Sequence, residues 1–505
     1  MPQKNAEKVV FIVLDGWGLN KKYAGNAVEL AHKPFFDKLW QRYPIATLET
    51  SGETVGLPEG QMGTSEVNHF TIGAGKVVFQ DLVRVNKAID DSTFFKNEAF
   101  LNSCNHVKKH NSTLHIFGLV SDGGVHSHIE HIKALVTMAK KQGVSSLYIH
   151  AFTDGRDTAP KSGLKFLHEL EDHLRTTGLG KIVSVVGRYY AMDRDKNWDR
   201  TNMAFNLITQ AEGEVFSSVE KAIQASYNNE ITDEFIKPCT VAPDTGESYV
   251  VRDTDAIIFA NFRNDRPRQL TEVFLKHGFK DLQFTTMTQY NPFYDVSVAF
   301  EQQKVDQCVG SVISDAKLKQ LRVTETEKFA HMTFFLNCKK EDAYEGEDRV
   351  MFDSSSDIPT HDYRPEMRAA DIAHEIVKNI ELEKYDAIFS NLCNADMIGH
   401  TGNIPAAVKG CEAVDLALAQ IVPNALKHGY TVIITADHGN AEEMLDEETG
   451  DMITCHSTNS VPFILVSEKY KTILRKSGTL VDMAPTIFKI LDLEKPEHMT
   501  GESFI

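Results

Sequence analysis

Short runs of β-branched and other apolar residues recur along this chain of 505 residues, and each run ends abruptly in polar residues. Runs of this kind are typical of strands buried on both faces of a parallel sheet. Helical patterns separate many of them, which predicts an α/β fold with parallel or mixed sheets and helices on both faces. We expect strands over residues 9–14, 113–117, 146–152, 181–186, 256–260, 385–390, 429–436 and 461–466. We also expect one amphipathic helix over residues 26–43.

The length of the chain predicts more than one domain, because 505 residues exceed what one simple core usually contains. No glycine- and serine-rich linker separates the parts. The connections between domains are therefore expected to be short, near residues 76–80 and 305–311.

The net charge is −18, from 53 basic and 71 acidic residues. This balance argues against nucleic acids and anionic membranes as partners, because both select a basic surface. A small anionic substrate remains compatible with this charge, since a local group of arginines can outweigh the negative electrostatic field of the whole chain. The apolar run over residues 9–14 is too short for a signal peptide, and no run approaches a membrane span. With seven irregularly spaced cysteines, this predicts a cytoplasmic protein with free thiols.

Carboxylates and imidazoles follow three of the predicted strands, at the edge where α/β folds bind ligands. The residues concerned are Asp15, Asp396 with His400, and Asp437 with His438, and His456 follows shortly after. Asp396 and His400 are four residues apart, so they share one side of a helical turn. A single pair of an aspartate and a histidine four residues apart more often lies on a solvated helix surface. Together they indicate two divalent cations with oxygen and nitrogen ligands, and Mn²⁺, Mg²⁺, Co²⁺ and catalytic Zn²⁺ all suit such ligands.

The stretch over residues 60–69 contains one possible nucleophile, Ser65, after a glycine turn and before a short helical pattern. A serine in this position is more often a helix cap. Two nearby metal ions would change that interpretation, because coordination lowers the pKa of a hydroxyl group and makes it nucleophilic. The backbone N–H groups at the start of the helix would then face an anion.

Arginines follow several predicted strands in the middle of the chain. They are Arg156, Arg188, Arg194, Arg263 and Arg266. Guanidinium groups bind phosphate and carboxylate through paired hydrogen bonds, so this group predicts a pocket for a small anion. The alternative is a set of surface ion pairs. The acidic partners would be Asp157, Asp193, Asp195 and Asp265.

Nine segments, taken in order, resemble the cofactor-independent (2,3-bisphosphoglycerate-independent) phosphoglycerate mutases of the alkaline phosphatase superfamily, and the match covers nearly the whole chain. The segments span residues 15–18, 60–69, 121–128, 154–157, 187–200, 261–266, 325–331, 396–402 and 435–440. Two residues depart from the family pattern. Thr64 stands where asparagine is usual, and Asn68 stands where glycine is usual. An asparagine still allows a left-handed backbone if the loop needs one.

The resemblance implies a discontinuous phosphatase-like domain, residues 1–78 and 309–505, with a phosphotransferase domain inserted over residues 79–308. It also implies roles for particular residues. One metal ion would be held by Asp396, His400 and His456, and the other by Asp15, Ser65, Asp437 and His438. The substrate would be held by His126, Arg156, Asp157, Arg188, Arg194, Arg263, Arg266 and Lys328.

The activity implied is interconversion of 3-phosphoglycerate and 2-phosphoglycerate in glycolysis and gluconeogenesis, through a phosphoserine at Ser65. Mn²⁺ is the expected metal, and 2,3-bisphosphoglycerate is not required. Either Asp157 or His126 would handle the proton of the acceptor hydroxyl. We expect a monomer whose domains close over the substrate to exclude water. The rival interpretations are a phosphomonoesterase, a phosphopentomutase, and a metal-binding scaffold without activity.

Overall fold

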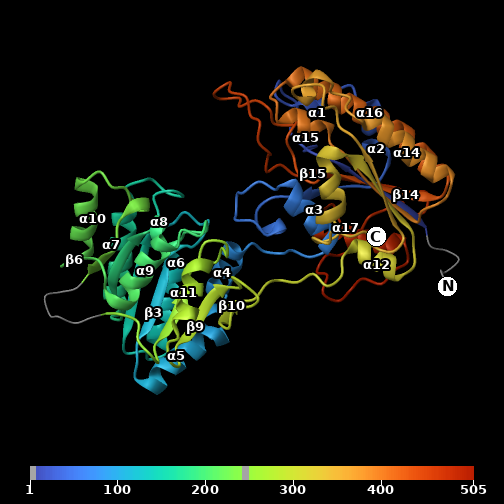
Figure 1. Ribbon diagram of the computed structural model, residues 1–505. Coiled ribbons are helices and arrows are strands. Elements are labelled where there is room, and N and C mark those ends of the chain that lie inside the picture. Colours follow the sequence, from blue (N-terminus) through green and yellow to red (C-terminus); the bar gives the residue numbers. More distant parts are fainter. Residues whose placement is uncertain (1–6, 242–248) are drawn as a thin grey trace. The chain divides into compact units, whose positions relative to one another are not determined.

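The computed structural model describes residues 7–241 and 249–505, and two compact units make up the chain (Figure 1). Unit 1 contains Met1–Phe79 and Lys304–Ile505, and unit 2 contains Gln80–Gln303. Phe79 and residues 304–308 thus belong to unit 1, although the sequence had suggested that they belong to the insert. Residues 1–6, which bear on the prediction that a signal peptide is absent, lie outside the described residues. The predicted α/β fold is confirmed.

Unit 1 is built on an eight-stranded mixed sheet in the order β12-β11-β13-β1-β14-β15-β2-β16. The strands are β1 (Lys8–Leu14), β2 (Ile45–Glu49), β11 (Gln320–Glu325), β12 (Glu347–Phe352), β13 (Ala387–Leu392), β14 (Tyr430–Thr435), β15 (Val461–Val466) and β16 (Ser477–Thr479). The apolar strand β1 lies at the centre, parallel to β13 and β14, and its residues from Val9 onward are buried. Val13 pairs with Asn391 on one side and Thr435 on the other, so these three strands end at one edge.

Helices cover both faces of this sheet (Figure 1). On one face α14 (Ala369–Glu381) and α16 (Ile404–Lys427) lie side by side. On the other face lie α3 (Ser65–Ala74), α12 (Val309–Asp315) and α17 (Met483–Ile490). The short helices α13 (Thr326–Ala330) and α15 (Asn394–Gly399) follow β11 and β13 directly.

The prediction of one helix over residues 26–43 is wrong. The structure has two helices instead, α1 (Ala27–Leu30) and α2 (Pro34–Arg42). Pro34 has no backbone N–H, and its ring disfavours helical geometry at the preceding residue. Lys33 accordingly has φ −122° and ψ 53°, and the second helix begins at the proline.

Unit 2 has its own eight-stranded sheet, in the order β10-β9-β8-β3-β4-β5-β7-β6. The strands are β3 (Leu114–Leu119), β4 (Leu147–Thr153), β5 (Lys181–Gly187), β6 (Glu214–Phe216), β7 (Cys239–Val241), β8 (Ala256–Phe259), β9 (Gln283–Thr288) and β10 (Ser297–Phe300). The run from β10 to β5 is parallel throughout, and β7 is antiparallel to β5. The carboxyl ends of β3, β4, β5 and β8 therefore meet at one edge.

Two separate apolar clusters sandwich the sheet of unit 2. The first contains residues of α4 (Asp81–Asp90), α5 (Glu98–His110), α6 (Ile129–Lys141), α7 (Gly163–Thr177) and α10 (Val219–Asn228). The second contains residues of α8 (Arg188–Ala191), α9 (Trp198–Gln210) and α11 (Arg268–His277). Helices thus lie on both faces here as well.

All seven cysteines are free thiols, as the sequence predicted. Among residues 7–241 and 249–505, every helix is too short or too polar to traverse a lipid bilayer.

Candidate active site

Ser65 is the first residue of α3, but it is not the cap of that helix. Thr64 is the cap, and its Oγ1 atom accepts a hydrogen bond from the Val67 N–H at 3.4 Å. The hydroxyl of Ser65, which is only 6% exposed, instead points into a cluster of charged groups. Its Oγ lies 2.6 Å from Lys328 Nζ and 2.9 Å from His438 Nε2. The hydroxyl group of Ser65 is therefore available to react as a nucleophile.

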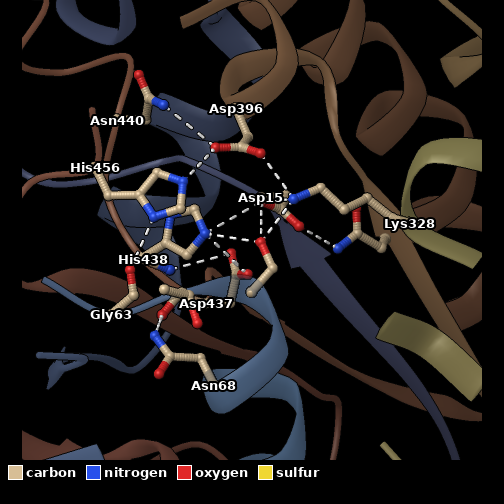
Figure 2. A network of polar contacts seen from close by, with 12 residues as sticks. Asp15, Gly63, Asn68, Lys328, Asp396, Asp437, His438, Asn440 and His456 are labelled. Atoms are coloured by element: carbon tan, nitrogen blue, oxygen red, sulfur yellow. Dashed lines mark hydrogen bonds and ion pairs between the residues drawn. The ribbon is translucent and has the colours of Figure 1, made fainter. Parts of the chain in front are cut away.

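Lys328 on α13 joins two carboxylates across this cluster (Figure 2). Its Nζ donates to Asp15 Oδ1 at 2.9 Å and to Asp396 Oδ2 at 2.7 Å. Burial opposes the charged form of the amine. The carboxylates of Asp15, Asp396 and Asp437 outweigh burial and raise the pKa of Lys328 well above its ordinary value. The ammonium group is therefore charged and donates to the oxygen of Ser65.

His400 and His456 turn their ring nitrogens toward the same carboxylate oxygen. Each Nε2 lies 3.2 Å from Asp396 Oδ1, and the two Nε2 atoms are 3.1 Å apart. Each Nδ1 faces a backbone carbonyl, that of Thr454 at 2.7 Å and that of Gly63 at 2.8 Å. A carbonyl only accepts, so Nδ1 carries the proton and leaves the Nε2 lone pair free. Metal-binding histidines are oriented in this way.

Asp437 lies two residues after the end of β14 and has an oxygen with unmet bonding capacity. Oδ1 accepts from the His438 N–H at 3.1 Å. Oδ2 is buried and has no hydrogen-bond partner within the described part of the chain, although His438 Nε2 and His69 Nδ1 lie 3.3 and 3.4 Å away. Burial, and then the neighbouring Asp15 carboxylate, raise the pKa of Asp437 to about 6. A cation at this oxygen would relieve both effects.

The donor set fits divalent cations. Three buried carboxylates, those of Asp15, Asp396 and Asp437, face the single ammonium group of Lys328, and buried charge of this kind needs compensation. Ligand atoms converge to within 4.8 Å in three groups. They are Asp396, His400 and His456; Asp15, Asp396 and His438; and Asp15, His69 and Asp437. Oxygen and imidazole ligands suit Mn²⁺, Mg²⁺, Co²⁺ or Zn²⁺.

Asn68 ties the Ser65 helix to the segment that carries two predicted ligands. Its Nδ2 donates to the carbonyl oxygen of Asp437 at 2.7 Å (Figure 2). The same nitrogen donates to the carbonyl oxygen of Thr50 at 3.0 Å. This role of Asn68 was not expected from the sequence, which allowed a left-handed backbone at this position. The residue lies inside α3 without a positive φ, so that conformation is not needed. The asparagine at position 68, where glycine is usual in the family, was the feature of the sequence that could have indicated this role.

Glu442 was also missed, although it connects three segments that carry predicted ligands. Oε2 accepts from the N–H groups of Gly18 at 3.0 Å and Asn440 at 2.8 Å. Oε1 accepts from Asn459 Nδ2 at 3.1 Å and from the hydroxyl of Ser457. These partners follow Asp15, His438 and His456 in the chain. Apart from Asn440, which is two residues away, these partners lie at least 15 residues from Glu442 in the chain, so the sequence contained no local signal for the contacts.

In unit 2, Arg188 is buried beside two aspartates at the carboxyl ends of β4 and β5. It is 2% exposed, and its Nη1 donates to Asp154 Oδ1 at 2.6 Å and Asp157 Oδ2 at 2.5 Å. Its Nε has no hydrogen-bond partner in the described residues. A buried guanidinium with an unused donor is suited to bind an anion.

The other predicted arginines gather around it, and three of them form ion pairs on the surface. Arg156 pairs with Glu234, while Arg194 and Arg263 share Asp265 at 2.7 and 3.2 Å. The pairs of Arg194 and Arg263 with Asp265 are of the kind that the alternative of surface ion pairs named, whereas Arg156 pairs with an acidic residue that it did not name. Arg266 donates to the Met192 carbonyl at 3.0 Å. Burial, and then repulsion from Arg188, Arg194 and Arg156, lower the pKa of Arg266, so positive charge is concentrated here.

His126 lies between two aspartates of the same group. Nε2 is 3.9 Å from Asp157 Oδ2, and Nδ1 is 3.8 Å from Asp265 Oδ1. Burial, and then the Arg188 charge, lower the pKa of His126 to about 4. The imidazole is therefore neutral near pH 7. The predicted site residues thus form two sets, one in each unit. Lys328, which was predicted to hold the substrate together with the arginines, belongs to the set in unit 1.

Comparisons with known proteins agree with these observations. Residues 85–292 match the family model described as "BPG-independent PGAM N-terminus". Proteins named 2,3-bisphosphoglycerate-independent phosphoglycerate mutase from Clostridium kluyveri and Staphylococcus epidermidis are 46% and 44% identical to the chain. The first match covers 98% of this chain and 99% of the relative, and the second covers 99% of each. A solved structure of phosphoglycerate mutase from Leishmania mexicana, at low cobalt concentration, is 27% identical with a TM-score of 0.54, covering 99% of this chain and 98% of that one.

Together, the fold and these matches define an α/β phosphoglycerate mutase. The identity extends over the full length of each relative. The chain belongs to the family of 2,3-bisphosphoglycerate-independent phosphoglycerate mutases, which are isomerases.

Proposed function

We propose that the chain interconverts 3-phosphoglycerate and 2-phosphoglycerate through a phosphoserine at Ser65. The observation that carries this proposal is that Lys328 and His438 converge on the hydroxyl oxygen of Ser65. Ser65 Oγ lies 2.6 Å from Lys328 Nζ and 2.9 Å from His438 Nε2, among three buried carboxylates. Such a group suits transfer of a phosphoryl group, where positioning and charge stabilisation dominate.

Two divalent cations, with Mn²⁺ the preferred ion, would be held by these residues. Asp396, His400 and His456 would bind one, and Asp15, Ser65, Asp437 and His438 the other. When bound, the cations would stabilise charge on phosphoryl oxygens and lower the pKa of the serine hydroxyl.

The residues of unit 1 perform the first transfer. Ionised Ser65 Oγ, whose proton would leave to solvent when the cations bind, attacks phosphorus in line. The Oγ–P bond forms, the bond from phosphorus to the glycerate oxygen breaks, and that oxygen takes a proton from Asp157 or His126. Lys328 donates to Ser65 Oγ and offsets the charge that develops on the transferring oxygens. In the second transfer the other glycerate hydroxyl attacks the phosphoserine, and Ser65 becomes the leaving group.

The residues of unit 2 keep glycerate bound between the transfers. Its carboxylate and phosphate would be held by Arg156, Arg188, Arg194, Arg263 and Arg266. Asp157 and His126, 3.9 Å apart, would form the acid–base pair for the attacking hydroxyl. One substrate must meet both sets of residues during a turnover, and water must be excluded, because hydrolysis of the phosphoserine would end the cycle.

We further propose that unit 1 has the phosphatase-like role and that unit 2 has the phosphotransferase role. We propose that the enzyme acts as a cytoplasmic monomer in glycolysis and gluconeogenesis, without 2,3-bisphosphoglycerate. The net charge of −18 supports the view that neither nucleic acid nor membrane is a partner.

The experiment is a coupled mutase assay with Mn²⁺ and no bisphosphoglycerate. Ser65→Ala should lose activity by several orders of magnitude, whereas Thr64→Ala, the matched control in the same loop, should keep most of it. Intact-mass measurement with substrate should detect one phosphoryl group on the wild-type chain and none on Ser65→Ala. Phosphate release measured in parallel separates a mutase from a phosphomonoesterase. Full activity of Ser65→Ala would exclude the phosphoserine route.

A further inference from the structure

A second group of potential metal ligands lies in unit 2, away from the arginines. His106 and His110 are on α5, and Asp281 precedes β9. One ligand atom from each residue lies within 4.8 Å of the other two. Helix α5 leads into the start of β3, and Asp281 lies at the start of β9, which is parallel to β8 and through it to β3. The group is therefore at the amino ends of the strands, at the opposite edge from the arginines.

His106 has the tautomer expected of a metal ligand. Its Nε2 lies 3.0 Å from the carbonyl oxygen of Thr254. Because a carbonyl only accepts, Nε2 carries the proton, and Nδ1 keeps its lone pair. Histidines that bind metals commonly donate their other ring N–H to a carbonyl in this way. His110 is one helical turn further along, and the two rings stack with centroids 4.5 Å apart.

The contact between His110 and Asp281 has the spacing that a tetrahedral cation requires. His110 Nε2 lies 3.4 Å from Asp281 Oδ2, which is long for a hydrogen bond. Two ligand atoms bound to zinc at roughly 2.1 Å, at the tetrahedral angle, are about 3.4 Å apart. The side chain of Asp281 is 63% exposed and that of His110 is 22% exposed, so an ion can enter from solvent.

We propose that His106, His110 and Asp281 bind one divalent transition-metal cation, Zn²⁺ foremost, with water completing its coordination. Two of the three ligands are imidazoles, which favour Zn²⁺ over Mg²⁺ or Mn²⁺. The bound ion links the end of α5 to the segment between α11 and β9. This site is separate from the cluster around Ser65 and takes no part in phosphoryl transfer.

Metal counting on the full-length chain tests the proposal. The protein is saturated with Mn²⁺ and titrated with Zn²⁺, and zinc retained and manganese released per chain are measured after gel filtration. For the wild-type protein, the number of zinc ions retained per chain should exceed the number of manganese ions released by one. His110→Gln and Asp281→Asn should bind that extra zinc at least about 10-fold more weakly. His277→Gln, an exposed histidine on α11 of the same unit, should behave as wild type.

Circular dichroism and thermal unfolding without zinc establish that each variant is folded. Thermal unfolding with zinc is a second readout, because an ion that binds the folded state raises its stability. The rise should be smaller in His110→Gln than in His277→Gln. Zinc uptake equal to manganese release in wild type would overturn the proposal, as would undiminished extra zinc in the double variant His106→Gln/His110→Gln.

Discussion

His456 Nδ1 lies 2.8 Å from the carbonyl oxygen of Gly63, so a single hydrogen bond connects a predicted metal ligand to the loop that presents Ser65. Gly63 has no room for a side chain. A Cβ atom there would lie 2.1 Å from the Thr50 carbonyl oxygen and 2.3 Å from Asn68 Nδ2. The position of this loop and the orientation of the ligand therefore depend on each other.

Gly63→Ala should consequently weaken metal binding and catalysis together. The collision is with backbone, so the loop must move and take the Gly63 carbonyl away from His456. We expect a loss of about 10- to 100-fold in Mn²⁺ affinity and in kcat. Isothermal titration and the mutase assay measure the two effects. Gly60→Ala is the control, since a Cβ there meets nothing within 4 Å and only its φ of +75° is strained. Equal losses in both variants would contradict this interpretation.

Asn68→Ala should destabilise the protein and reduce activity. It leaves the carbonyls of Thr50 and Asp437 without their donor, and each unpaired buried polar group costs about 1–3 kcal/mol. Chemical denaturation measures the free energy of unfolding. Asn424→Ala, which removes one bond to the carbonyl of Gln420 on α16, should change it by less than about 0.5 kcal/mol. A fully stable and active Asn68→Ala variant would show that the bridge is dispensable.

Lys328→Met should abolish mutase activity and alter the response of stability to metal. Without the ammonium group, Asp15 and Asp396 repel each other, and breaking such buried pairs costs about 3–5 kcal/mol. Divalent cations then replace a missing charge, so the rise in unfolding temperature on adding Mn²⁺ should exceed that of wild type. Differential scanning calorimetry with and without Mn²⁺ gives both values. Lys427→Met, at an exposed position on α16, should match wild type.

Acidification should weaken metal binding. The Asp396 carboxylate accepts a hydrogen bond from protonated His400 and so raises the pKa of His400. Burial opposes the charged form of His456, but the same carboxylate outweighs burial and raises the pKa of His456. Protons therefore compete with metal at higher pH than they would for a free histidine, and Mn²⁺ affinity should fall at least about 10-fold between about pH 8 and about pH 6. Isothermal titration in buffers of different ionisation enthalpy measures affinity and proton release. An affinity that does not change over this range would contradict the expectation.

The same shifts predict the opposite trend for the stability of metal-stripped protein. Folded-state pKa values raised above the unfolded value stabilise the fold below about pH 6.5, and this contribution is lost as pH rises through the raised values. Metal-stripped protein should thus lose this contribution between about pH 6 and about pH 8, whereas metal-loaded protein should gain stability. Unfolding curves at both pH values, with chelator or with Mn²⁺, compare the two trends.

Asp154→Asn should raise the KM for phosphoglycerate and leave metal affinity unchanged. Asp154 Oδ1 holds Arg188 at 2.6 Å, so its loss removes the support of a buried guanidinium. We expect KM to rise by about 10- to 100-fold, the usual range for a residue that positions a ligand. Asp172→Asn, which breaks an exposed ion pair with Arg175 in the same unit, is the control. A change in the Mn²⁺ affinity of Asp154→Asn would refute the separation of substrate binding by unit 2 from metal binding by unit 1.

Much of the fold could be predicted from local pattern. The apolar run at β1 and the strand before Asp437 are continuous and buried on both faces, and such runs identify central strands of a parallel sheet. The helix over residues 26–43 was mispredicted because its apolar period continues across Pro34, whereas the missing N–H and the proline ring divide the backbone there. Short strands such as β16 contain too few residues for an apolar pattern that would predict them from the sequence.

The sequence by itself determined the types of residue available for chemistry and the likeness to one family. It also indicated that Asp15 and Asp437 follow strands, since an acidic residue directly after an apolar run is a local feature. Only the tertiary structure decided that Thr64, rather than Ser65, caps α3, and that Asn68 and Glu442 hold the ligand segments together. These contacts join residues far apart in the chain, and packing, not spacing, brings their atoms within hydrogen-bonding distance.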